Sequence, residues 1–343
     1  MIFSFTRIPD GPVEEFLAFA RAGYDLGFRR LWIPDQTYYA DPFVLLAQVA
    51  REVPQLELGL AVTNPYTRHP VQIARAAATV AEVAGGRLLL GLGAGNRKHL
   101  IDRLGLDGRH APERVREAAL LIRRLLAGET VRWDGYWTLH EVALQTAGRP
   151  EVPIIIGTRN PKMLRVAGEV GDGVMLESLV SPEAQAYGLD EVRLGARRAG
   201  RSLEGFEVVA WQSVRVTDDR AGAIEALRPW AAYLLGMTTP AVAARMGVDP
   251  EVTRRVHDAF AAEGPEAAAR FVGADEVDRF VIAGSPSDVA VRCAALFRGG
   301  ATDFAVQVTR VGARQQLLRF AQEVRPLIEG MLAGAGDPNV RNA

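Results

Sequence analysis

Short apolar segments alternate with longer amphipathic segments along most of the chain. The short segments predict buried parallel strands, because strands covered on both faces appear as continuous apolar runs. The longer segments predict helices, since their apolar residues recur every three or four positions. Strands are predicted at residues 2–6, 30–33, 56–62, 87–92, 153–156, 173–177, 206–216 and 303–308. Helices are predicted at residues 12–26, 42–52, 69–83, 111–127, 161–170, 182–199, 218–235, 286–297 and 313–328.

Two segments interrupt this alternation. Residues 130–152 contain two strand-like runs on either side of Asp134-Gly135, a pair typical of a β-hairpin turn. Residues 236–280 are mostly helical and lack a strand of their own. Eight βα units without a linker favour an α/β fold, a (β/α)8 TIM barrel with a hairpin insertion after strand 4 and a helical insertion before strand 8. We expect one domain over residues 1–330 and a loose tail over 331–343.

Composition narrows the class of protein. The chain has 343 residues, of which 48% are hydrophobic and 24% charged, as in globular proteins. Its net charge of −1 gives no general attraction to nucleic acid or to an anionic membrane. Residues 2–5 enter a strand directly without a secretory signal, so we expect a cytoplasmic protein. Cys293 is the only cysteine, which excludes an internal disulfide and predicts a small core residue.

Polar loops follow the predicted strands, and barrel enzymes build their active sites from such loops. Strand 56–62 leads into Thr63-Asn64-Pro65 and then into a helix, with Thr67 or His69 near its cap and Pro70 in its first turn. This arrangement predicts a ligand site at the strand end, and an ordinary βα connection is the alternative.

Lysine is rare in this chain: Lys98 and Lys162 are the only two among 40 basic residues. Both follow predicted strands. The second lies at a predicted helix N-terminus, where backbone donors and the helix dipole favour anions. The segment predicts a phosphate or anion site, with a solvated helix cap as the alternative. Its residues are Gly157, Thr158, Arg159, Asn160, Lys162 and Met163.

Other catalytic motifs give weaker signals. The run Gly91–Gly95 lacks the third glycine of a dinucleotide fingerprint, because Asn96 stands there, and it predicts instead a close approach of the backbone to a flat ligand. The five histidines have no metal-ligand spacing, so we expect no metal site. No nucleophile elbow and no Walker loop is present. These observations indicate that a cofactor carries the chemistry.

Several of these motifs together resemble the bacterial luciferase-like superfamily of flavin- and deazaflavin-dependent oxidoreductases. The motifs are Thr63–Pro70, Gly85–Gly95, Gly171–Val174, Ala283–Val289 and Gly299–Asp303. The branch most similar to the chain is the coenzyme F420-dependent methylenetetrahydromethanopterin reductases. The resemblance implies an eightfold barrel and a non-prolyl cis peptide at Ala61–Val62, behind the cofactor ring. It also implies transfer of a hydride between that ring and a substrate over its open face.

The resemblance also implies roles for individual residues. Its catalytic positions correspond here to Asp35, Gln36 and Asn96. Ring contacts correspond to Asp35, Thr63, Asn64 and Asn96, and the phosphate-bearing tail of the cofactor corresponds to the loop 157–163. The full cofactor-binding set is Ala61, Val62, Thr63, Asn64, Gly95, Asn96, Lys98, Gly157, Thr158, Arg159, Asn160, Lys162 and Met163.

The substrate stays open because the chain departs from two branches of the family. Thr6 stands where the methanopterin reductases carry glutamate. Gln36 and Asn96 stand where the F420-dependent sugar-phosphate dehydrogenases carry histidine and glutamate. We expect an F420-dependent oxidoreductase for a small organic substrate, with pterin- or folate-like compounds among the candidates. It is expected to form a homodimer and to bind neither nucleic acid nor membrane. The alternatives are an FMN-dependent luciferase-like monooxygenase or reductase, and a non-catalytic ligand-binding barrel.

Overall fold

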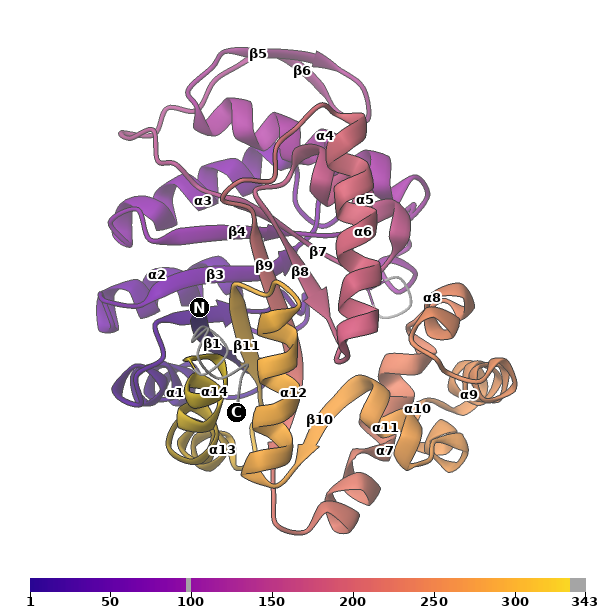
Figure 1. Ribbon diagram of the computed structural model, residues 1–343. Coiled ribbons are helices and arrows are strands. Elements are labelled where there is room, and N and C mark those ends of the chain that lie inside the picture. Colours follow the sequence, from indigo (N-terminus) through magenta and orange to yellow (C-terminus); the bar gives the residue numbers. More distant parts are fainter. Residues whose placement is uncertain (97–99, 334–343) are drawn as a thin grey trace, which may run out of the picture. The chain divides into compact units, whose positions relative to one another are not determined.

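The computed structural model describes residues 1–96 and 100–333 (Figure 1). Contacts between residues divide this chain into two compact units. The amino-terminal unit consists of Ser4–Met175 and Glu191–Glu207. The carboxyl-terminal unit consists of Met1–Phe3, Leu176–Asp190 and the residues from Val208 onward. Each unit is described by itself below.

The strands of the amino-terminal unit run parallel in the order β1-β2-β3-β4-β7-β8. Their register places Ser4 opposite Arg30 and Leu58 opposite Leu88, and their residues are mostly buried, as expected of strands covered by helices. The strands are β1 (Ile2–Thr6), β2 (Arg30–Ile33), β3 (Glu57–Thr63), β4 (Leu88–Leu92), β7 (Ile154–Gly157) and β8 (Gly173–Glu177). The helices between them are α1 (Val13–Asp25), α2 (Pro42–Glu52), α3 (Pro70–Val83), α4 (Ala111–Leu126) and α5 (Pro161–Val170).

The interior of this unit contains a buried charge. The guanidinium of Arg30, which is 1% exposed, donates from Nε to Glu57 at 2.5 Å and from Nη1 to Glu207 at 2.6 Å. The same guanidinium lies over the ring of Trp32, 5.5 Å from its centroid. One arginine therefore joins the amino-terminal ends of three strands, β2, β3 and β9 (Glu207–Val216).

The predicted hairpin is confirmed. β5 (Val131–Asp134) and β6 (Thr138–Val142) form a separate antiparallel pair between α4 and β7. The hairpin begins shortly after α4, and Glu117 of that helix accepts the N–H of Trp137 at 3.1 Å.

The carboxyl-terminal unit is built around β9 (Glu207–Val216), a strand of ten residues. Its residues Val209–Ser213 pair in parallel with β11 (Asp303–Gln307), and Ser213–Val216 pair with β10 (Val281–Gly284). At the end of the β10 pairing, the N–H of Thr217 donates to the carbonyl of Gly284 at 2.8 Å. The helices of this unit are α7 (Arg220–Gly236), α8 (Pro240–Arg245), α9 (Pro250–Glu263), α10 (Pro265–Ala268), α11 (Ala274–Phe280) and α12 (Pro286–Arg298). α6 (Pro182–Arg198) contributes residues to both units.

Residues 236–280 are mostly helical, as predicted, but strand β10 directly after them was not predicted. It consists of Val281-Ile282-Ala283-Gly284, four apolar residues that follow a helix without a turn signal. A run of that length has the same pattern in a strand and in a buried helix, so periodicity did not identify it.

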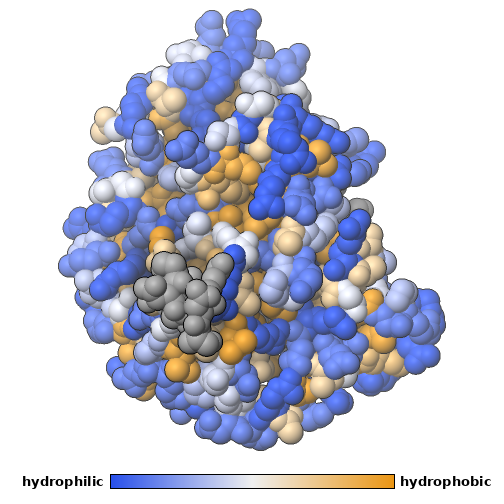
Figure 2. Space-filling view, in the orientation of Figure 1, coloured by the Kyte–Doolittle hydropathy of each residue, from blue (hydrophilic) through white to orange (hydrophobic). Residues whose placement is uncertain are grey.

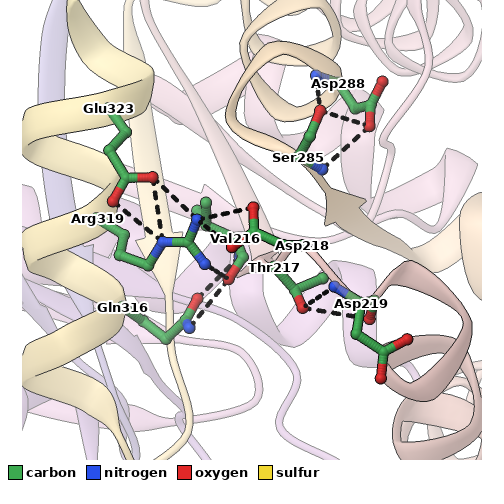
Figure 3. Close-up of polar contacts among 9 residues, drawn as sticks. All are labelled: Val216, Thr217, Asp218, Asp219, Ser285, Asp288, Gln316, Arg319 and Glu323. Carbon is green, nitrogen blue, oxygen red and sulfur yellow. Dashed lines mark hydrogen bonds and ion pairs between the residues drawn. The ribbon is translucent and has the colours of Figure 1, made fainter.

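A polar network joins the end of β9 to α13 (Ala313–Arg319), as Figure 3 shows. The amide of Gln316 accepts the N–H of Val216 at 2.8 Å and donates to its carbonyl at 3.2 Å. Arg319 pairs with Asp218 at 3.2 Å and with Glu323 at 2.9 Å. Nearby, the Ser285 and Asp288 side chains form a capping box at the start of α12.

The last helical segment is longer than predicted. α13 continues through a π-helical turn (Phe320–Val324) into α14 (Arg325–Ala333). Residues 331–333 of the predicted tail are therefore helical, and the rest of that tail lies outside the described residues. The prediction of one domain over residues 1–330 stays a prediction.

The eight predicted strands correspond to β1, β2, β3, β4, β7, β8, β9 and β11, and the fold is the predicted α/β class, a (β/α)8 barrel. Hydrophilic residues cover most of the visible face, with apolar patches between them (Figure 2). In the part of the chain that the structure describes, no helix has the length and apolar character to cross a membrane.

Candidate functional site

Asp35 and Thr63 connect the carboxyl ends of two neighbouring strands, β2 and β3. The hydroxyl of Thr63 donates to Oδ2 of Asp35 at 2.7 Å, and the N–H of Thr37 donates to Oδ1 at 3.2 Å. Thr63 is fully buried, whereas Asp35 is partly exposed. The carboxylate therefore has a fixed position with one side toward solvent.

Asn64, the next residue after β3, is 1% exposed. The oxygen and the nitrogen of its side-chain amide have different environments. Its oxygen accepts the N–H groups of Tyr66 at 3.1 Å and Thr67 at 3.0 Å, which stabilises the turn. Its nitrogen, Nδ2, is buried and has no hydrogen-bond partner among the described residues. A buried donor left unpaired costs about 1–3 kcal/mol, so this nitrogen is available for an acceptor on a ligand.

The peptide bond Ala61–Val62 is cis, which confirms the expectation drawn from the family resemblance. The side chain of Val62 lies against glycines at the ends of β4 and β7. A Cβ on Gly93 would lie 2.6 Å from Val62 Cγ2, and a Cβ on Gly157 would lie 2.5 Å from Val62 Cγ1. A Cβ on Gly91 would lie 1.8 Å from a backbone oxygen of β3.

These contacts give two glycines of the run a packing role, and the predicted approach of the backbone to a flat ligand stays a prediction. Gly91 and Gly93 were expected to let the backbone approach a flat ligand. In the structure they make room for strand β3 and for Val62. The sequence pattern could not distinguish the two roles, because both require the absence of a side chain.

The remaining predicted residues around this strand end have different environments. Gly95 has a φ of +70°, and a Cβ placed on it would lie 3.4 Å from Asn64 Cγ. Asn96 is half-buried, and its carbonyl accepts the N–H of Leu100 at 2.9 Å. Gln36 is exposed to solvent. Lys98 lies outside the described residues. The structure thus brings together Asp35, Thr63, Asn64 and Gly95.

The loop from Gly157 to Met163 forms the start of helix α5. The side chain of Asn160 is the helix cap and accepts the N–H of Lys162 at 3.0 Å. The hydroxyl of Thr158 in turn accepts the N–H of Asn160 at 3.0 Å. Lys162 is exposed, Arg159 is half-buried and the side chain of Met163 is buried. Two cationic side chains at a helix N-terminus are favourable for an anion, and an ordinary solvated cap stays an alternative.

The sequence did not connect the hairpin insertion with the loop that carries Asn64, whereas the structure shows a connection through Arg114. The guanidinium of Arg114 lies over the ring of Tyr66 at 5.7 Å and over that of Tyr136, in the hairpin turn, at 4.8 Å. Burial raises the pKa of the Tyr66 hydroxyl above its usual value of 10. The hairpin therefore contacts the loop that carries Asn64, and no local pattern in the sequence signals a contact over this distance along the chain.

Two further residues singled out in the sequence, Asp172 and Cys293, make contacts within the fold. Asp172 accepts the N–H of Ile154 and a guanidinium N–H of Arg123, each at 2.8 Å. Cys293 is fully buried, as predicted, and burial raises the pKa of its thiol. Over residues 1–96 and 100–333, no group of three or more His, Cys, Asp or Glu residues is placed to hold a metal ion.

The fold is a (β/α)8 barrel, and buried polar side chains at the carboxyl ends of β2 and β3 form its candidate ligand site. The chain belongs to the luciferase-like monooxygenase family, whose sequence pattern matches residues 1–303.

Three similar proteins narrow the comparison. A 5,10-methylenetetrahydromethanopterin reductase from Archaeoglobus fulgidus is 32% identical over 88% of this chain and 92% of that protein. An F420-dependent glucose-6-phosphate dehydrogenase from Beutenbergia cavernae is 31% identical over 82% of this chain and 81% of that protein. The solved coenzyme F420 dependent tetrahydromethanopterin reductase from Methanopyrus kandleri is 26% identical, with a TM-score of 0.83 over 95% of this chain and 98% of that structure.

Proposed function

We propose that the protein is an F420-dependent oxidoreductase that transfers a hydride between the deazaflavin ring and a small organic substrate. The observation that carries this proposal is the buried Nδ2 of Asn64, which has no partner among residues 1–96 and 100–333 and lies beside the Asp35–Thr63 pair. Relatives named as F420-dependent enzymes support the choice of cofactor.

The residues present fit a planar heterocycle with an anionic tail. Nδ2 of Asn64 would donate to an acceptor on the ring edge, since it is a buried donor without a partner among the described residues. The backbone at Ala61–Val62 would support the ring from behind, as the family resemblance implies. Arg159, Lys162 and the backbone at the start of α5 would hold the tail.

When bound, F420 supplies the ring carbon that donates or accepts the hydride. The contribution of the chain is to position the ring and to keep water from it. Thr63 and Asn64 are almost completely buried, so their hydrogen bonds to a ligand form in a medium of low dielectric constant and are correspondingly strong. Thr63 also fixes the carboxylate of Asp35 at the rim of the same site.

Fewer observations bear on the substrate than on the cofactor. The hydroxyl of Thr6, at the end of β1, is buried and lacks a partner in the described part of the chain. A polar but uncharged group at this position favours a neutral polar substrate. Pterin-like compounds are the first substrates to test, because relatives are named for a reaction of methylenetetrahydromethanopterin, even though Thr6 replaces the glutamate of that branch.

The test compares two cofactors on the purified protein. We expect F420 to bind in a saturable fluorescence titration with one ring per chain, and FMN to bind far more weakly. Protein that retains FMN and ignores F420 would contradict the proposal in favour of a flavin enzyme. Protein that binds neither would contradict it in favour of a non-catalytic barrel.

The proposal includes a homodimer that acts in the cytoplasm, in keeping with the family resemblance, whose members are commonly dimers. Light scattering on the purified protein is expected to give twice the mass of one chain. A monomer mass at micromolar concentration would contradict this part of the proposal and leave the cofactor assignment unchanged.

A further inference from the structure

A chain of hydrogen bonds in the carboxyl-terminal unit links α7 to the carboxyl ends of β9 and β11. The indole Nε1 of Trp230, in α7, donates to Oγ of Ser213 in β9 at 2.9 Å. The same hydroxyl donates to Oε1 of Gln307 in β11 at 2.8 Å. Ser213 and Gln307 are register partners on the two strands, so their side chains lie next to each other.

This chain of hydrogen bonds fixes the orientation of the Gln307 amide. An indole nitrogen only donates, so the Ser213 hydroxyl accepts from Trp230 and gives its own hydrogen to the amide oxygen. The amide nitrogen, Nε2, therefore points away from Ser213. Gln307 is partly exposed, and its Nε2 has no hydrogen-bond partner among residues 1–96 and 100–333. Its two N–H groups are thus available to an acceptor.

The covering helices show on which face of the strands these groups lie. The ring of Phe304, in β11, lies 6.2 Å from that of Phe297 in α12 and 6.0 Å from that of Phe320 in the π-helical turn. Side chains alternate between the two faces of a strand. Gln307, three residues after Phe304, therefore lies on the face opposite these helices, and Ser213 shares that face.

Arg215 adds a positive charge to the same face of β9. It follows Ser213 by two residues and is exposed, whereas Val214 and Val216 on either side of it are buried. Its guanidinium has no ion pair, hydrogen bond or ring contact with any residue that the structure describes. Glu177, which ends the neighbouring strand β8, interacts with another residue and does not neutralise this charge.

Together these side chains offer donors and no free acceptor. Alternate residues of a strand are about 7 Å apart, a distance that an arginine side chain spans, so Arg215 and Gln307 can contact one ligand group. A guanidinium beside an amide N–H pair favours the oxygens of a carboxylate or phosphate. Trp230 is half-buried and stacks on Tyr233, with ring centroids 5.1 Å apart, and it supplies an apolar surface next to the donors.

We propose that Arg215 and Gln307 bind the carboxylate or phosphate of an organic anion whose apolar part lies against Trp230. Barrel proteins bind ligands at this end of their strands. The proposal does not depend on F420 or on the neutral group inferred from Thr6, because the residues behind both belong to the amino-terminal unit.

Four benzene derivatives of similar shape test the proposal in ligand-detected NMR titrations of the whole protein. Benzoate and phenyl phosphate are anions, benzamide is neutral and benzamidine is a cation. We expect at least one of the two anions to bind at least about tenfold more tightly than benzamide and benzamidine. The anion that binds more tightly identifies the group that the site takes.

Variants locate the binding. Arg215→Met removes the charge at an exposed position, and we expect it to weaken binding of the anion about tenfold. Gln307→Glu keeps an acceptor for Ser213 but replaces the free donors by a negative charge, and we expect it to abolish binding of the anion. Arg255→Met, at an exposed position of α9, is the matched control and should bind as the unaltered protein does. A thermal unfolding curve of each variant confirms that it is folded.

Several outcomes would overturn the proposal. They are binding of benzamide or benzamidine as tight as that of the anions, equal effects of Arg215→Met and Arg255→Met, and absence of binding by all four compounds. If Gln307→Glu fails to fold, Arg215→Met and the ligand series still decide. None of these results bears on the F420 titration, so the two proposals fail separately.

Discussion

Asn64 shows how one buried side chain can stabilise a loop and leave a ligand donor free. Its oxygen accepts two backbone N–H groups, and this fixes the orientation of the amide. The nitrogen of the same amide must then point away from the turn, and it finds no partner among the described residues. Pre-orientation of this kind lowers the entropy lost when a ligand binds.

The neighbouring hydroxyl gives a direct test of the proposed site. Thr63→Val keeps the shape of the side chain but removes the donor to Asp35, so the carboxylate loses its fixed position. We expect the dissociation constant for F420, measured by fluorescence, to rise about tenfold. Thr79→Val, at an exposed position of α3, is the matched control. Unchanged F420 affinity in Thr63→Val would exclude this pair from the cofactor site.

The packing of Val62 on glycine leads to a prediction about stability. Gly93→Ala would place a methyl group 2.6 Å from Val62 Cγ2, and we expect a loss of about 1–3 kcal/mol in urea unfolding. Adding Val62→Ala removes the clash, so the double variant should regain part of that loss. Gly148→Ala has open space around it and serves as the control. Additive losses in the double-mutant cycle would refute the contact.

Residues differ in how far the sequence could predict them. Contacts of Asp35, Thr63 and Asn64 with a cofactor ring are implied by the family resemblance alone. That these residues lie in polar loops at strand ends was predictable from the sequence pattern. The fit of Val62 against Gly93 and Gly157 was not, because it depends on how three strands lie side by side. The contact of Tyr136 with Arg114 was not predictable for the same reason.

Among the helices, α3 has a cap that titrates. Nδ1 of His69 accepts the N–H of Val71 at 3.2 Å, which requires a neutral ring, and burial lowers the pKa of His69 below its usual 6.5. The unfolded chain therefore binds the proton more readily than the folded one. This cap contributes fully above about pH 6.5 and loses its contribution as the pH falls toward the lowered folded-state pKa.

His69→Asn tests this prediction, because asparagine caps helices well and does not titrate. We expect the free energy of unfolding of the unaltered protein to fall more steeply between about pH 7 and pH 5 than that of the variant. The measurement is urea unfolding at several pH values. Parallel pH profiles would show that the ring does not act as a cap in solution.

Elements were predicted best where they are long and periodic. The start of α3 at Pro70 agrees with the cap and proline signals, and the hairpin agrees with its Asp-Gly turn. β10 escaped prediction because a four-residue apolar run has no period to measure. The pairing of β10 with β9 is a tertiary interaction, and only the structure reveals it.

At the scale of the whole molecule, the order of strands and helices was available from the sequence, and the buried charges were not. Alternating apolar and amphipathic segments predicted all eight barrel strands. Arg30 appeared as an ordinary strand residue, yet it binds Glu57 and Glu207 across a long separation in sequence. Polar residues inside a barrel pair with residues that are distant in the sequence, so the local sequence pattern does not identify their partners.

This arginine gives the largest stability effect that we predict. Arg30→Met would leave two carboxylates without their shared cation, at a cost of about 3–5 kcal/mol in urea unfolding. Arg21→Met removes an exposed pair with Glu52, and we expect a loss of less than about 1 kcal/mol. Equal losses in the two variants would show that burial of the Arg30 network does not matter for stability.

The hydrogen bond between Thr217 and Gly284 has a consequence for how such a molecule can evolve. The helical segment leaves the sheet after Val216 and rejoins it at Val281, and the pairing of β10 with β9 together with this bond holds its two ends close to each other. A segment whose two ends lie close together can change in length without moving the strands on either side of it. We therefore expect relatives to differ in the length of this segment more than in strand β9, which is held in the sheet by its pairing with β11.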